Sequence, residues 1–199
     1  MQQRRTSLLW LLTTLCAAST AFAAGPPLKV AADGFPTGHT TPEGPACDLE
    51  RAAMKGDAKL FRSACLPLFG GGENRQKYAA YLKETAASLT ARLRQAKGRV
   101  PLPNGPQAIG KVYASRALSQ NGPASYGYSV FGFQDVRFVD VGMELSKGKR
   151  GLNRILVIRA DNGRWYAHPA PEIHPLLRAG LNQEEASSKD FSQVYTIPR

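Results

Sequence analysis

Asn162-Gly163 limits the possible folds more than any other part of this sequence, because the dipeptide lies between two strand-like runs. The runs are RILVIRAD at 154–161 and RWYAHP at 164–169. Asn-Gly between β-branched and aromatic residues is a strong short-range signal for a two-residue hairpin turn. We therefore predict an antiparallel hairpin over residues 154–169.

A two-residue turn also sorts the hairpin side chains into two faces, since it pairs Ala160 with Trp165 and Val157 with His168. One face is wholly apolar and carries Leu156, Ile158, Ala160, Trp165 and Ala167. The other face is mixed and carries Ile155, Val157, Arg159, Asp161, Arg164, Tyr166 and His168. We therefore predict that Trp165 points into the core, whereas His168 points outward.

Strand-like alternation extends upstream of the hairpin, over 107–118, 126–133 and 133–146. In the third run the alternation changes phase after Phe138, as a β-bulge would produce. With a bulge there, the carboxylates of this run fall on the outward, polar side: Asp135, Asp140 and Glu144.

Helical periodicity is confined to the part of the chain before the strands. Two short helices are expected over 47–54 and 58–65, separated by the breaker KGD at 55–57. A longer helix is expected over 74–97, ending before Gly98. Its apolar residues recur every three or four positions and form one stripe: Tyr78, Tyr81, Leu82, Thr85, Ala86, Leu89, Leu93 and Ala96.

The first 23 residues have the pattern of a secretory signal peptide: Arg4 and Arg5, a short apolar run, and the cleavage-type triplet AFA at 21–23. We therefore expect an exported protein, periplasmic or secreted, with no membrane span after cleavage. The expected divisions are a signal peptide at 1–23, a flexible arm at 24–45, an α+β domain at 46–182 and a tail at 183–199. An exported compartment is oxidising, so the even pair Cys47 and Cys65 predicts a disulfide. It can form only if the chain folds back near residues 55–57 and brings the two cysteines together at the open end of the two short helices.

The charge balance is basic, because the chain without its first 23 residues carries 24 basic and 15 acidic residues, a net charge of +9. Such a balance favours anionic partners or simply aids solubility. The densest patch is 146–154, where Lys147, Lys149 and Arg150 occupy an expected hairpin tip and offer contacts to an anionic envelope polymer. Nucleic acid is not favoured, because aromatic and basic residues do not interleave.

The motifs of several common chemistries do not occur in this sequence. It has no Gly-x-Ser-x-Gly nucleophile elbow, and GGGEN at 70–74 lacks the Lys and Ser/Thr of a phosphate loop. His168 and His174 match no usual zinc spacing. We expect neither a metal nor a cofactor.

The predicted order of elements is two short helices, a longer helix, and bent strands that end in a Trp-bearing hairpin. This order resembles the nuclear transport factor 2-like (SnoaL-like) superfamily. The matching segments are AAMKGDAKLF at 52–61 and the strand with NGRWY at 154–166. The resemblance covers residues 46–170 and implies a cone-like curved antiparallel sheet packed on the N-terminal helices, around an apolar pocket. Candidates for lining that pocket are Tyr78, Tyr81, Phe131, Met143 and Trp165.

Fold alone does not fix function, since this superfamily hosts both enzymes and binding modules. We predict an exported non-enzymatic module that holds a small apolar ligand or a protein partner in the cell envelope. The alternative is an isomerase or hydratase in which Asp135 or Asp140 turns into the cone as the acid residue. A third hypothesis is a structural envelope protein that touches anionic polymer through its basic tip. The mixed hairpin face, with Arg159, Tyr166 and His168, predicts a homodimer interface.

Overall fold

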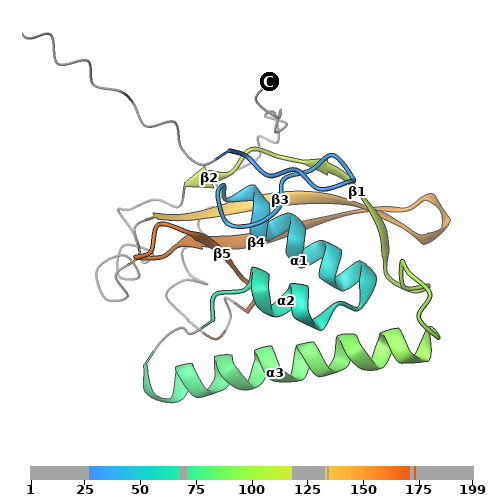
Figure 1. The fold of residues 1–199 in the computed structure, drawn as a ribbon, viewed down its shortest axis with the longest axis horizontal. Coiled ribbons are helices and arrows are strands. Elements are labelled where there is room, and N and C mark those ends of the chain that lie inside the picture. The colour runs from blue at the N-terminus through green and yellow to red at the C-terminus, as the bar shows by residue number, and fades with distance from the viewer. Residues whose placement is uncertain (1–26, 68–70, 118–132, 134, 171–172, 174–199) are drawn as a thin grey trace, which may run out of the picture.

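A computed structural model describes residues 27–67, 71–117, 133, 135–170 and 173 (Figure 1). The fold is α+β, with three helices followed by a five-stranded antiparallel sheet that does not close into a barrel. The helices are α1 (Glu43–Lys55), α2 (Ala58–Ala64) and α3 (Gly72–Gln95). The strands are β1 (Pro106–Val112), β2 (Arg116–Ala117), β3 (Asp135–Leu145), β4 (Arg150–Arg159) and β5 (Trp165–His168). The predicted signal peptide, most of the 126–133 strand and the tail lie outside the described residues.

The predicted helices are confirmed, and so is the breaker between the first two. α1 ends at Gly56, whose φ of 64° is the left-handed conformation that favours glycine. Asp57 then caps α2, because its carboxylate accepts hydrogen bonds from the amides of Lys59 (3.0 Å) and Leu60 (2.9 Å). Along α3, the predicted apolar stripe is the buried or half-buried side, and the remaining positions are mostly exposed.

The predicted bulge in β3 is wrong. β3 pairs with β4 in unbroken register from Asp135 opposite Arg159 to Glu144 opposite Arg150, and the irregularities lie in β1 instead. The sequence changes phase because both faces of β3 are buried. Val136 and Phe138 belong to one apolar cluster, whereas Val139, Val141 and Met143 belong to another.

The hairpin is confirmed, but its register differs by one residue from the prediction. Arg159 pairs with Trp165 and Leu156 with His168, so the loop has three residues, 161–163. Gly163 has a φ of 73°, and its amide donates to the Ala160 carbonyl at 2.9 Å, as in a three-residue hairpin loop. A register shift of one residue moves the side chains of one strand to the opposite face relative to those of its partner strand. Trp165 therefore shares a face with Val157 rather than with Ile158.

Each of the two sheet faces carries its own apolar cluster. α1 lies in front of the sheet in Figure 1 and packs on the face that bears Trp165. Trp165 is 6% exposed, so the prediction that it points into the core is confirmed. On the opposite face, Tyr78 of α3 clusters with Phe138 and Leu156. α2 lies between α1 and α3, and a third cluster joins the three helices: Ala52, Phe61, Cys65, Ala86 and Leu89.

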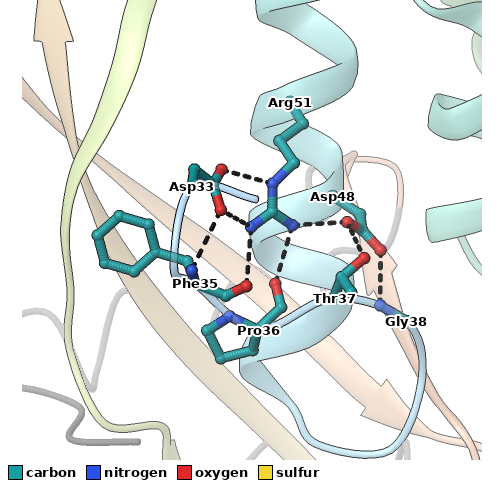
Figure 2. A network of polar contacts seen from close by, with 7 residues as sticks. All are labelled: Asp33, Phe35, Pro36, Thr37, Gly38, Asp48 and Arg51. Carbon is teal, nitrogen blue, oxygen red and sulfur yellow. Dashed lines mark hydrogen bonds and ion pairs between the residues drawn. The ribbon is translucent and has the colours of Figure 1, made fainter. Parts of the chain in front are cut away.

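The N-terminal arm docks on α1 through a polar network, which we call the arm clasp (Figure 2). Arg51 lies at its centre and donates to Asp33 and Asp48, each at 2.7 Å, and to the carbonyls of Phe35 and Pro36. Asp48 accepts further bonds at 2.7 Å from the Thr37 hydroxyl and the Gly38 amide. The arm is shorter than the predicted 24–45, because residues 43–45 already belong to α1.

Candidate functional site

A cleft of about 580 Å³ lies between the helices and the sheet. It is bounded by α1, the end of α2, the middle of α3, the first half of β4 and the end of β5. Its lining residues are Leu49, Glu50, Ala53, Phe61, Tyr81, Thr85, Leu89, Arg92, Leu152, Asn153, Arg154, Ile155, Leu156, His168 and Pro169. Small-molecule sites usually occupy about 300–1,000 Å³ and combine an apolar lining with a few polar groups. The cleft volume falls in this range, and its walls combine apolar residues with several polar ones.

Glu50 is the most unusual residue of the cleft, because it is an acidic residue in the lining and yet is only 5% exposed. Burial raises the pKa of the Glu50 carboxyl, and a hydrogen bond of 2.8 Å from the Asn153 side-chain amide offsets part of this effect. α1 supplies Glu50 and β4 supplies Asn153, so the pair fixes one polar point where helix and sheet meet. A buried carboxyl with a raised pKa is a candidate for proton transfer.

Arg154 brings a second polar group to the cleft wall, and its position is fixed by Asp140. The Asp140 carboxylate accepts from Arg154 at 2.8 and 3.1 Å and from Arg116 at 2.7 Å. Both guanidinium groups also lie over the Phe138 ring, at 4.3 Å for Arg116 and 4.8 Å for Arg154. This arrangement holds Arg154 rigidly at the cleft.

Asp140 is only 2% exposed, so the prediction that it faces outward is wrong. Unbroken β3–β4 pairing places it on the same face as Phe138, where Arg116 and Arg154 pair with it. Asp135 is half-buried and pairs with Arg137 at 2.7 Å, and Glu144 is exposed. Neither Asp135 nor Asp140 lines the cleft.

The predicted pocket residues are dispersed. Tyr81 lines the cleft, and its hydroxyl donates to the Pro169 carbonyl at 3.3 Å. Tyr78 is buried, and its hydroxyl donates to the Leu66 carbonyl at 3.0 Å. Met143 and Trp165 belong to the cluster under α1, and Phe131 lies outside the described residues.

His168 is buried, at 1% exposure, which corrects the prediction that it points outward. The shifted register turns it toward α3, where its ring lies 4.7 Å from that of Tyr78, and it also lines the cleft. Of the other predicted interface residues, Arg159 is exposed and Tyr166 is half-buried. The homodimer stays a prediction.

The predicted Cys47–Cys65 disulfide is not formed, because both residues are free, buried thiols. Cys47 packs in the cluster between α1 and the sheet, whereas Cys65 packs in the cluster that joins the three helices. Burial raises the pKa of each thiol to about 12.

Buried thiols with a raised pKa react slowly with alkylating agents. We expect iodoacetamide to leave Cys47 and Cys65 unmodified in the folded protein and to alkylate both in concentrated urea. Peptide mass spectrometry measures this directly, with a sample treated with dithiothreitol as the control. If the cysteines resist alkylation in urea until dithiothreitol is added, the disulfide exists after all.

Sequence reasoning missed Glu50 and Asn153, although one signal was available. Glu50 falls on the buried side of α1, three residues after Cys47 and four before Met54, which is the spacing of an apolar stripe. An acidic residue on such a stripe indicates a buried carboxyl. Nothing in the sequence marks Asn153 as its partner, because this contact depends on how α1 lies against β4.

Within the described residues, no group of three or more His, Cys, Asp or Glu side chains is placed to hold a metal ion. In the same part of the chain, no helix combines the length and apolar character needed to cross a membrane. Comparison of the chain with protein-family models, with curated proteins and with solved structures gave no match in any of the three.

Proposed function

We propose that this protein is an exported, non-enzymatic binding module that holds a small, mainly apolar molecule in the cleft between α1, α3 and β4. The observation that carries the proposal is the buried Glu50 carboxyl, which accepts a hydrogen bond from Asn153 in a cleft of about 580 Å³ with both apolar and polar walls. In this proposal, apolar residues such as Leu49, Phe61 and Leu89 surround the ligand and the polar pair orients one polar group of it. The export signal at residues 1–23 supports a role in the cell envelope.

We also propose a shape for the domain: the curved sheet and the helices pack as a cone that encloses the ligand. Glu50 and Arg154 support it, because α1 and β4 bring both to the same cleft from opposite sides. A ligand with a hydroxyl group could donate a hydrogen bond to the Glu50 carboxyl, and a ligand group with a partial negative charge would lie near Arg154.

Native mass spectrometry of the mature protein from its own envelope fraction tests the proposal. We expect a retained small molecule in the wild type and its loss in Ala53→Phe, because Ala53 lines the cleft and a phenyl ring would fill much of it. Ala87→Phe is the matched control, since Ala87 is exposed on α3. Nile red, an uncharged apolar dye, serves as a probe if the ligand is lost during purification. Equal retention of ligand and dye by both variants would show that the cleft is not the site.

A second candidate function is acid–base catalysis by Glu50, favoured by the raised pKa of this carboxyl. Glu50 replaces Asp135 and Asp140 in this role, since it alone of the three lines the cleft. Glu50→Gln separates the two functions, because glutamine still accepts the Asn153 hydrogen bond but cannot take up a proton. A binding module should keep its ligand in this variant with little dependence on pH, whereas an enzyme should bind but no longer convert it. Glu84→Gln on the exposed side of α3 is the control.

A further inference from the structure

A second hollow, of about 570 Å³, lies in the sheet and shares Leu152 with the lining of the α1–α3 cleft. Backbone and side chains of β1, β3 and β4, together with Tyr113, line it: Gly110, Lys111, Tyr113, Gly142, Met143, Glu144, Arg150, Gly151 and Leu152. By strand alternation, Gly142 and Leu152 belong to the sheet face opposite the one that α1 covers. The hollow is therefore a separate feature of the fold.

Gly142 is the reason that the sheet is hollowed at this point. Its neighbours across the sheet are Lys111 on β1 and Leu152 on β4, so a side chain at 142 would stand between theirs. A Cβ atom there would lie 3.4 Å from the Lys111 carbonyl oxygen and 3.5 Å from the Lys111 Cβ, which the backbone can accommodate. Glycine inside a strand weakens the sheet and often marks a place where a ligand approaches closely. Packing of the sheet therefore does not require glycine at position 142, which forms the floor of the hollow.

The rim of the hollow is basic. Lys111 and Arg150 flank the floor from two strands, and the adjoining β3–β4 turn adds Lys147 and Lys149, all of them exposed. Glu144 is the one acidic residue in the lining. None of the four cations forms an ion pair with any residue in the described ranges.

The apolar wall of the hollow distinguishes it from a plain cationic patch. Leu152 is 46% exposed, one of few large apolar side chains in the described structure with that much exposure. Tyr113 is half-buried, and the Lys111 ammonium lies 5.0 Å from its ring centre. A flat lipid surface would meet Lys147 and Lys149 at the turn but not the recessed Gly142, and a nucleic acid would need open aromatic faces for its bases.

We infer that this hollow binds an acidic polysaccharide, a chain of sugar units that carry carboxylates. The apolar faces of the sugar rings would lie on the Gly142 floor and against Leu152, while Lys111 and Arg150 pair with carboxylates on either side. Lys147 and Lys149 would meet the chain as it leaves the hollow. This inference does not depend on the α1–α3 cleft.

Binding of alginate oligosaccharides, which are chains of uronic acids, tests the inference on the mature protein at low salt. We expect binding of alginate but not of uncharged dextran. Gly142→Val fills the floor and leaves every charge in place, and it should weaken binding about tenfold. Lys111→Gln with Arg150→Gln should weaken it by a similar factor, since two exposed ion pairs together contribute about that much. Lys83→Gln with Arg94→Gln, the same charge change on exposed positions of α3, should have little effect.

Two further variants test the inference if Gly142→Val lowers the stability of the protein. Gly142→Ala adds one methyl group, and Leu152→Ser alters a side chain that is 46% exposed, so thermal melting should show both folded. Alginate binding should still weaken about threefold in each. Unchanged binding in every Gly142 and Leu152 variant would overturn the inference, since the hollow would then have no part. Tighter binding of inorganic polyphosphate or of anionic lipid vesicles than of alginate would also overturn it. The cleft variant Ala53→Phe should bind alginate as the wild type does. The alginate measurement therefore tests the hollow independently of the proposed ligand site in the cleft.

Discussion

Replacing Arg51 with methionine should lower the free energy of unfolding by about 3–5 kcal/mol. Arg51 is 5% exposed at its side chain, and its guanidinium donates to two carboxylates and two carbonyls at 2.7–3.0 Å. Methionine fills a similar volume but pairs with none of these acceptors. Asp48, also buried, would keep its bonds from Thr37 and Gly38 but lose its cation. Removing one member of a buried ion pair costs more than the pair contributes, because the remaining charge stays in a poorly solvated place.

Urea denaturation followed by circular dichroism measures this loss. Arg62→Met is the matched control, since Arg62 is exposed on α2, and its effect should stay within about 0.5 kcal/mol. The effect of Arg51→Met should also shrink in acid. Burial alone would raise the pKa of the Asp33 carboxyl, but hydrogen bonds from Arg51 and Phe35 outweigh it and hold this pKa below 3.8. The Asp33 contribution is therefore present above pH 3.8 and lost as the pH falls through the lowered pKa. A loss under 1 kcal/mol at pH 7 would mean that the arm clasp is not formed in solution.

Replacing Asp140 with asparagine should lower the free energy of unfolding by about 2–3 kcal/mol. The Asp140 side chain is 1% exposed and is the shared partner of Arg116 and Arg154. Asparagine keeps the shape and one acceptor, but it removes the negative charge between two guanidinium groups. The expected loss is below that for Arg51→Met, because the two arginine side chains are 29% and 17% exposed and water solvates them in part.

Asp135→Asn is the control for Asp140→Asn, because Asp135 lies on the same strand and pairs with one half-exposed arginine. Its loss should be under about 1 kcal/mol in the same urea titration. The comparison separates a structural role for Asp140 from a catalytic one. If Asp140→Asn leaves stability unchanged but removes an activity of the wild type, the structural role assigned to Asp140 is wrong.

The helices could be predicted from sequence, because each has an apolar stripe of helical period and distinct end signals. Gly56 and Asp57 end one helix and begin the next, and these effects are local. Sheet register was harder, because it depends on which face is buried. Leu156 and Val157 are both buried, on opposite faces of β4, so alternation could not identify the core face. A one-residue change in loop length then reversed the prediction for His168.

The functional residues were the least predictable part, for a related reason. Tyr78, Met143 and Trp165 were proposed as pocket residues from their size and apolar character, which core residues share. The cleft is instead marked by a polar pair, and Glu50 meets Asn153 only across 103 positions of sequence. Such a contact becomes visible when the packing of α1 on the sheet is known.

The arm clasp also has a consequence for the order in which the chain folds. Arg51 contacts partners only 3 to 18 positions away, whereas the β1–β3 pairing joins Ile109 to Met143. The entropy lost on closing a loop grows with its length, so short-range contacts form sooner than long-range strand pairs. The arm and α1 can therefore associate as soon as both have left the ribosome. The strands would then assemble on a helix that already has its N-terminal cover in place.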